Sequence, residues 1–274
     1  PGISQAAVPF EQQIEGKNAA QACGHHLFGA GSAGAAIAVK EWLERTGPPG
    51  TIQFFGTPAE EGGSGQVYMV RAGLFDDVDT VIHWHPSSVN AADSASTLAN
   101  RSAKFTFSGV SSHAASAPDR GRSALDAVEA MNFMVNLLRE HVPTSTRLHY
   151  VITNGGSAPN VVPNTAQSFY YVRHPNETTL REIWDRVMAT AEAAAVGTGT
   201  SMKYEIIHGN YSVLPNDTLA KVMHAKLSSV GGVEYSEADE VFAAEISKTL
   251  PTGAYTKGRA SKIKPFETGQ RGNG

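Results

Sequence analysis

Apolar and polar positions alternate along the first part of the chain in two different periods. Residues 51–55 (TIQFF) and 80–84 (TVIHW) are short apolar runs that are typical of strands, and a helical pattern lies between them at 66–72. Residues 26–45 are rich in alanine and end at Gly-Pro-Pro-Gly (47–50), which predicts a helix with a clear stop. This order of helices and strands predicts an α/β fold.

A second pattern begins near residue 99. Strands are expected at 104–109, 148–153, 168–173 and 202–207, and amphipathic helices at 123–141 and 178–196. The order β-α-β-β-α-β is that of a ferredoxin-like module, an antiparallel sheet with two helices on one face. A further helix is expected at 217–230. We therefore predict an α/β domain that starts at 1–98 and returns at 211–250, with a ferredoxin-like α+β domain inserted at 99–210.

The last segment, residues 251–274, differs from the rest in charge. It carries five basic residues (Lys257, Arg259, Lys262, Lys264 and Arg271) against one acidic residue, Glu267, together with several glycines and few large apolar residues. Such a segment buries too little surface to offset its chain entropy. We expect a basic, Gly-rich tail that is disordered.

Composition excludes several classes of protein. The 274 residues include one cysteine, so no intramolecular disulfide can form, and a reducing compartment is indicated. No apolar run reaches the length of a membrane span and no signal peptide is visible, which predicts a cytoplasmic protein without a membrane partner. The net charge of −4 gives no basic footprint for nucleic acid. Ten histidines point instead to imidazole or metal chemistry.

Three short motifs carry side chains that bind metals. Cys23 and His25 stand at the start of the first predicted helix, where the helix dipole lowers the pKa of a thiol. Glu60 and Glu61 follow the first predicted strand, and adjacent carboxylates can divide metal binding from general-base work. His83 and His85 alternate along the second predicted strand and therefore share a face.

Each motif alone has a simpler interpretation. The Cys-Gly-His triplet can be a structural accident at a helix start, and the two glutamates can form a solvated acidic turn that caps the next helix. Together, at the ends of three elements, they favour a metal site. Six histidines without a motif are expected on the surface or at caps: His26, His141, His149, His174, His208 and His224.

These motifs resemble the M20 family of metallopeptidases and amidohydrolases, and within it the p-aminobenzoyl-glutamate hydrolase branch. The likeness covers about residues 1–250. It rests on CGH (23–25), TPAEEGG (57–63), HWHP (83–86), FSG to HAA (107–115), GRSALDA (121–127) and NVVP (160–163). The resemblance implies a catalytic domain with two divalent ions, zinc or manganese, and an inserted lid domain that forms a homodimer. The implied substrates are small amides or dipeptides.

The resemblance also implies roles for individual residues. Cys23, His25 and Glu61 would bind metal, and Glu60 would be the general base. The next ligand is His85 or His83, and the surrounding motif favours His85. The lid residue His113 would reach the partner's active site and polarise the scissile carbonyl, although it can also be a plain loop histidine. Asn160 and Arg173 would hold the substrate's carboxylate, although Arg173 can instead pair with an acid on its own sheet.

The sequence departs from the family pattern at both ends. The family's opening segment and its closing segment, which bears a last metal-ligating histidine, are not found here, and no histidine follows His224. The resemblance therefore implies a partial catalytic domain in which one metal lacks a ligand. Two hypotheses follow: a metal-dependent amidohydrolase whose activity as this chain alone is in question, or a catalytically silent metal-binding or oligomerisation fragment of such an enzyme.

Overall fold

The computed structural model describes residues 23–92, 94–253 and 255–271. The first 22 residues of the predicted 1–98 segment, and residues 272–274 of the predicted tail, lie outside the described part. The chain divides into two compact units. Unit 1 comprises Pro1–Thr57, Phe75–Ser94 and Asn216–Thr268, and unit 2 comprises Pro58–Leu74, Ala95–Pro215 and Gly269–Gly274. The α/β class is confirmed.

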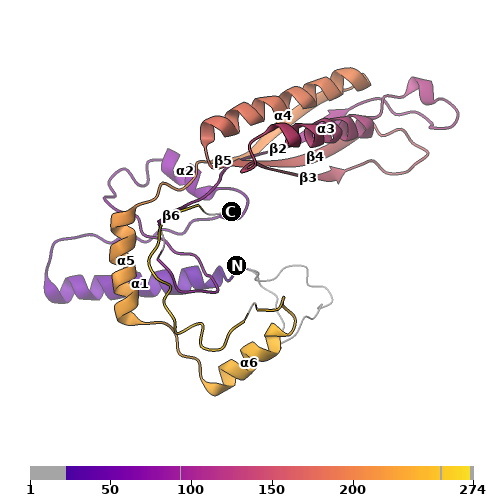
Figure 1. The fold of residues 1–274 in the computed structure, drawn as a ribbon. Coiled ribbons are helices and arrows are strands. Elements are labelled where there is room, and N and C mark those ends of the chain that lie inside the picture. The colour runs from indigo at the N-terminus through magenta and orange to yellow at the C-terminus, as the bar shows by residue number, and fades with distance from the viewer. Residues whose placement is uncertain (1–22, 93, 254, 272–274) are drawn as a thin grey trace. The chain divides into compact units, whose positions relative to one another are not determined.

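Unit 2 contains a four-stranded antiparallel sheet of order β3-β4-β2-β5 (Figure 1). The chain runs through β2 (Ala99–Ser108), α3 (Ala124–Leu138), β3 (Arg147–Asn154), β4 (Thr165–His174), α4 (Glu177–Thr198) and β5 (Ser201–Asn210). The six predicted elements of the β-α-β-β-α-β order are therefore present, each somewhat shifted or extended at its ends. Short 3-10 turns, η1 (Pro118–Arg120) and η2 (Arg139–His141), flank α3.

The core of unit 2 lies between one face of this sheet and the two helices. Strand residues such as Phe105 and Tyr170 pack with α3 residues such as Met131 and with α4 residues such as Trp184, all almost fully buried. Figure 1 shows α3 and α4 together on this side of the sheet. Because strand side chains alternate, the neighbouring residues on each strand point to the opposite face, which these helices do not cover.

Polar side chains within this core are paired with one another. The buried hydroxyl of Tyr170 donates to Oδ1 of Asn132 on α3, and burial raises the pKa of Tyr170 well above its ordinary value. Ser168 donates to the same oxygen at 3.3 Å. Ser123 and Asn176 cap α3 and α4, each accepting a backbone N–H from the first turn of its helix.

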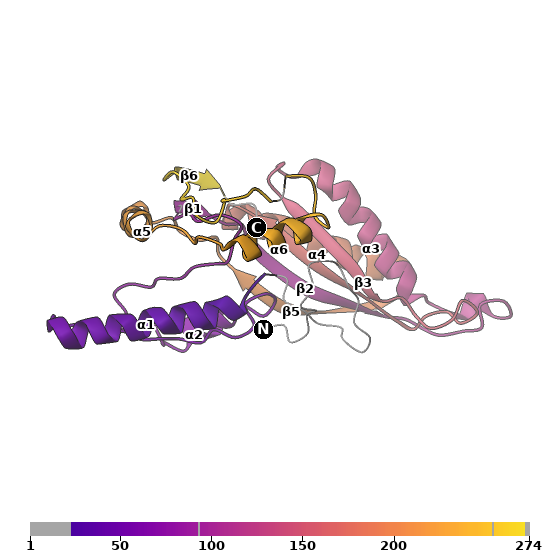
Figure 2. The ribbon, with the colours of Figure 1, turned by 90° about the horizontal axis from the view of Figure 1, so that it is seen from below.

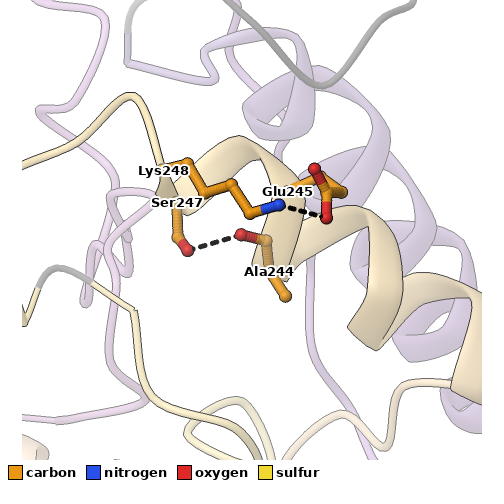
Figure 3. Close-up of polar contacts among 4 residues, drawn as sticks. All are labelled: Ala244, Glu245, Ser247 and Lys248. Carbon is orange, nitrogen blue, oxygen red and sulfur yellow. Dashed lines mark hydrogen bonds and ion pairs between the residues drawn. The ribbon is translucent and has the colours of Figure 1, made fainter.

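Unit 1 contains α1 (His26–Thr46), α5 (Asp217–Val230) and α6 (Glu237–Ser247). The predicted helices at 26–45 and 217–230 are confirmed, and α1 runs unbroken over 21 residues to the left-handed Gly47 (Figure 2). Helix α6 was not predicted from the sequence. This helix starts at a capping box between Ser236 and Asp239. It ends where Ser247 donates to the Ala244 carbonyl at 2.7 Å and Lys248 pairs with Glu245 (Figure 3).

The two strands predicted at 51–55 and 80–84 are wrong for this structure. Both segments are extended backbone without a strand partner among the described residues. Their apolar side chains are correspondingly open: Phe54 is 54% exposed and Ile82 is 69% exposed. A strand is stabilised by its ladder and by burial of its faces, and neither is present at these positions. The short helix expected at 66–72 is confirmed as α2 (Gly65–Arg71), in unit 2.

The expectation of a disordered segment at 251–274 differs from the structure for the described residues. Asn90 donates to the carbonyl of Ala260 at 2.5 Å, and its own carbonyl accepts the N–H of Lys264 at 2.9 Å. The two-stranded pairing of β1 (Ser94–Ser96) with β6 (Thr268–Arg271) follows. Backbone hydrogen bonds to residues far along the chain replace the apolar burial that the composition lacks. None of the described helices combines the length and the apolar character that crossing a membrane requires.

Candidate functional site

A group of three metal-binding side chains lies in unit 1. The ligand atoms of Cys23, His25 and His85 all lie within 4.8 Å of one another. Gly24 allows this close approach, because its φ of +75° is unfavourable for other residues and a Cβ there would contact Pro86 at 3.4 Å. The start of α1 and the segment around residue 85 are thereby brought together.

Aromatic packing holds these two segments in register. Phe28 lies on His25, His85 and Trp84, with ring centroids 4.8 to 5.5 Å apart. The indole Nε1 of Trp84 donates to Ser32 at 3.1 Å, and the same ring lies against Gly31, where a Cβ would come within 2.9 Å of it. The small residues of α1 thus make room for Trp84, which carries its neighbour His85 to Cys23 and His25.

The hydrogen bonding of His85 leaves one ring nitrogen for a metal. Nδ1 lies 2.7 Å from the carbonyl oxygen of Pro86, and since a carbonyl only accepts, Nδ1 carries the proton. Nε2 of the neutral ring therefore has a lone pair, as a metal ligand requires. Of the two candidate histidines, His85 joins the group and His83 does not. One thiolate and two imidazoles suit zinc, so this part of the predicted ligand set fits the metal.

Glu60 and Glu61 lie in unit 2, on the turn that precedes α2. Both side chains are exposed. The turn is closed by a hydrogen bond from the Gly63 N–H to the Ala59 carbonyl at 2.9 Å. Ala59 (φ 53°) and Ser64 (φ 48°) flank it in the left-handed region, which residues other than glycine rarely adopt. The two carboxylates are therefore carried by a strained turn, and strain of this kind clusters at functional sites.

His113 and Asn160 lie on two loops of unit 2 that are joined through their backbones. The Ala114 N–H donates to the Asn160 carbonyl at 3.0 Å, and His113 forms an antiparallel bridge with Val161. Nδ1 of His113 accepts the backbone N–H groups of Ala115 and Ser116, both at 3.2 Å. The neutral ring thus carries its proton on Nε2, as a hydrogen-bond donor on an exposed side chain.

Arg173 lies on β4, on the sheet face without helices, opposite Asn100 of β2. Its guanidinium stands 5.4 Å from the ring centroid of Tyr171. None of the carboxylates in the described ranges forms an ion pair with it, and its Nε is buried without a hydrogen-bond partner there. The alternative in which Arg173 pairs with an acid on its own sheet is thus not what the described residues form.

His208 was expected on the surface, and this expectation is wrong. It is 7% exposed, as is His174, which bonds Ser145 and Asn176. His208 lies between Asn100 (3.0 Å to Nε2) and Ser102 (2.9 Å to Nδ1). Burial lowers the pKa of His208, Arg173 lowers it further, and a hydrogen bond with the Gly62 backbone acts in the opposite direction. A polar residue that alternates with the core positions of β5 was the available signal.

Known proteins of one family are similar to this chain in sequence. The sequence pattern of peptidase family M20/M25/M40 matches residues 1–253. The chain is 46% identical over 229 residues to one of the two subunits of the p-aminobenzoyl-glutamate hydrolase of Escherichia coli, covering 83% of this chain and 48% of that protein. It is 32% identical over 247 residues to the mouse Xaa-Arg dipeptidase, covering 89% of this chain and 56% of that one.

Solved structures show the same fold at lower identity. A putative aminohydrolase from methicillin-resistant Staphylococcus aureus superposes with a TM-score of 0.57 at 14% identity, over 82% of this chain and 63% of that one. An aminobenzoyl-glutamate utilization protein from Klebsiella pneumoniae superposes with a TM-score of 0.50 at 24% identity, over 70% of this chain and 53% of that one. The chain spans about half the length of the two curated relatives.

Proposed function

Since the chain belongs to peptidase family M20/M25/M40, we propose that it acts in metal-dependent hydrolysis of amide bonds in N-acyl and aminoacyl amino acids. The observation that carries this proposal is the grouping of Cys23, His25 and His85, with the proton of His85 held on Nδ1. Relatives named as a p-aminobenzoyl-glutamate hydrolase and a dipeptidase support substrates of the same kind.

The proposed metal site takes Cys23, His25, His85 and Glu61 as ligands, with His83 outside it. We propose two divalent ions, zinc or manganese. When bound, such ions acidify a water molecule and polarise the carbonyl that it attacks. The thiolate and imidazoles favour zinc, and the carboxylate suits either metal.

The chain's own residues then divide the proton transfers. Glu60 accepts a proton from the attacking water and returns it to the leaving amine nitrogen, which is the work of a general base that becomes a general acid. Its neighbour Glu61 points elsewhere and serves as a ligand. The strained turn between Ala59 and Ser64 supports this division, because it fixes two adjacent carboxylates in different directions.

His113 and Arg173 are proposed to hold the substrate. Nε2–H of His113 donates to the carbonyl oxygen, where negative charge develops, and the two backbone N–H groups on Nδ1 keep the ring in the tautomer that this requires. Arg173 binds the carboxylate of the leaving amino acid with Asn160 beside it. The absence of a competing acid among the described neighbours of Arg173 supports that role.

We further propose that residues 99–210 act as a lid and as the homodimer contact, with 1–98 and 211–250 contributing the catalytic domain. The sheet of unit 2 ends in two unpaired edge strands, β3 and β5. Next to β3 in the chain, Phe133 and Leu137 expose 65% and 54% of their surface, one turn apart on α3. A cytoplasmic location stays a prediction.

Turnover tests the proposal directly. A panel of N-acyl amino acids and p-aminobenzoyl-glutamate is assayed with added Zn²⁺ or Mn²⁺, and again after a chelator has removed the metal. We expect hydrolysis of at least one substrate with metal and its loss with the chelator. Metal that binds with the affinity of a structural site and yields no turnover on any substrate would instead support a silent metal-binding module.

A further inference from the structure

His208 stands on the helix-free face of the unit 2 sheet because of an irregularity in β5. The register between β2 and β5 shifts at Ser102/Ala103, so that His208 pairs with Ser102 while Ile206 pairs with Ala103. One extra residue, Ile207, is accommodated there. A bulge of this kind re-aims the side chains that follow it, and bulges are frequent beside active sites.

The hydrogen bonds of the ring define its protonation. The amide nitrogen of Asn100 can only donate, so Nε2 of His208 accepts at 3.0 Å and the proton of the neutral ring lies on Nδ1. Nδ1 is 2.9 Å from the Ser102 hydroxyl. Asn100 and Ser102 are themselves 9% and 0% exposed. Both partners belong to the central strand β2, so the ring is anchored to the most constrained part of the sheet.

The third contact of His208 leads to the turn that carries the two glutamates. The ring forms a hydrogen bond with the backbone of Gly62, which directly follows Glu61. Tyr171, whose ring centroid lies 5.1 Å from that of His208, comes to the same residue: a Cβ on Gly62 would lie 3.9 Å from the Tyr171 hydroxyl. The turn between Ala59 and Ser64 is thus held from the sheet at its centre.

The strain in this turn makes such an anchor necessary. Two residues other than glycine have positive φ, at 53° and 48°, on either side of the glutamates. Conformations of this kind persist only where the surroundings over-determine them. The closing hydrogen bond from Gly63 to Ala59 lies within the turn and cannot fix it to the unit.

We propose that His208 is a positioning residue, which holds the Glu60–Glu61 turn on the sheet through Gly62 and so sets the direction of the general base. This inference rests on the proposed function for the role of Glu60. The placement of the turn does not depend on it. No ligand of the proposed metal site has to titrate for His208 to act, because the neutral ring supplies the contact.

Steady-state kinetics test the catalytic consequence in the whole protein. His208→Ala is expected to lower kcat on the order of tenfold to a hundredfold with KM changed less than about threefold, as is typical of groups that orient a catalytic residue. His208→Gln, which can still donate to Gly62 and accept from Asn100, should recover most of the loss. The matched control is His149→Ala on the same face, an exposed histidine. Equal kcat values for the His208→Ala and His149→Ala variants would overturn the inference.

Hydrogen exchange separates this inference from the proposed function. The Gly63 amide, protected by its bond to Ala59, should exchange at least about tenfold faster in the His208→Ala variant, whereas amides of α3 keep their rates. Asn100→Ala should act in the same direction and covers the case in which the His208 variant does not fold. Faster exchange in a protein without turnover would retain the positioning role and refute Glu60 as the base. Unchanged exchange at Gly63 in both variants would refute the positioning role.

Discussion

Nδ1 of His85 lies 2.7 Å from the carbonyl oxygen of Pro86, and this contact decides which nitrogen of the ring can bind a metal. The proline at 86 is the residue immediately after the histidine, so the acceptor is supplied by the same short segment. Metal-binding histidines commonly donate their second nitrogen to a carbonyl in this way. His83, two residues earlier, is not in the group that His85 forms with Cys23 and His25.

His85→Ala should therefore reduce bound zinc, and His83→Ala should not. Removal of one of three or four ligands weakens a site strongly, so the zinc content of the dialysed His85 variant is expected to fall by at least half. Atomic absorption on both variants and the parent gives the comparison. Loss of zinc in the His83 variant with retention in the His85 variant would reverse the assignment.

Glu60→Gln should separate catalysis from metal binding. The amide keeps the size of the side chain and removes the proton acceptor, so turnover should fall on the order of 10²-fold or more while metal content stays at the parental level. Glu129→Gln, at an exposed position on α3, is the control for a change of charge. Parental turnover in the Glu60 variant would show that another group takes the proton.

Phe133→Glu should weaken the proposed homodimer. Phe133 exposes 65% of its surface on α3, and a carboxylate at the centre of an apolar contact is costly to desolvate. Light scattering at micromolar concentration should give a dimer for the parent and a monomer for this variant. Val196→Glu, at an equally open position on α4, should leave the mass unchanged. A parent that is monomeric would remove the reason to place His113 in the partner's site.

The stability of the protein should fall on the acid side of pH 6.5 because of His208. Burial, with help from Arg173, lowers the pKa of this ring below its ordinary value of 6.5. In that range the unfolded chain binds a proton that the folded chain does not. The free energy of unfolding therefore decreases as pH falls below 6.5, until the folded ring also becomes protonated. Urea unfolding of the parent and of the His208→Gln variant, above and below this pH, measures the difference. An equal slope in both would assign the dependence to other groups.

Ser236→Ala should destabilise α6 by about 1 kcal/mol, the usual value of an N-cap. Ser236 and Asp239 bond reciprocally at the start of the helix, and these bonds lower the pKa of Asp239. Hydrogen exchange in the first turns of α6 reports the change. Ser229→Ala, which removes a hydroxyl near the end of α5, is the comparison, and its α6 amides should exchange at the parental rate.

The sequence predicted unit 2 better than unit 1 for a physical reason. In unit 2 the apolar period of each segment matches what the fold buries, as the alternating Phe105 and Phe107 do on β2. The residues at 51–55 and 80–84 have a strand-like composition as well. A strand also needs a neighbour, and a local pattern contains no information about whether one is present. The capping box of α6 was visible at Ser236 and Asp239, but the helix buries no residue and has little apolar period.

Within the candidate site, the metal-binding motifs were readable because each is short. Cys23 and His25 are two residues apart, and spacing alone could place them together. The choice between His83 and His85 depended on a hydrogen bond to Pro86, and the family resemblance supplied only a preference. His208 was missed because its partners Asn100 and Ser102 lie more than 100 residues earlier and meet it only through the sheet register.

The central strand β2 has a consequence for how the protein is made. Its two neighbours are β4 and β5, and Ser108 pairs with Ser201, 93 residues later. At typical rates of synthesis, on the order of 5–20 residues per second, β2 leaves the ribosome several seconds before β5 does. During that interval Phe105 and Phe107 have no complete core to enter, so the nascent chain is most prone to aggregation, and most dependent on chaperones, between the emergence of these two strands.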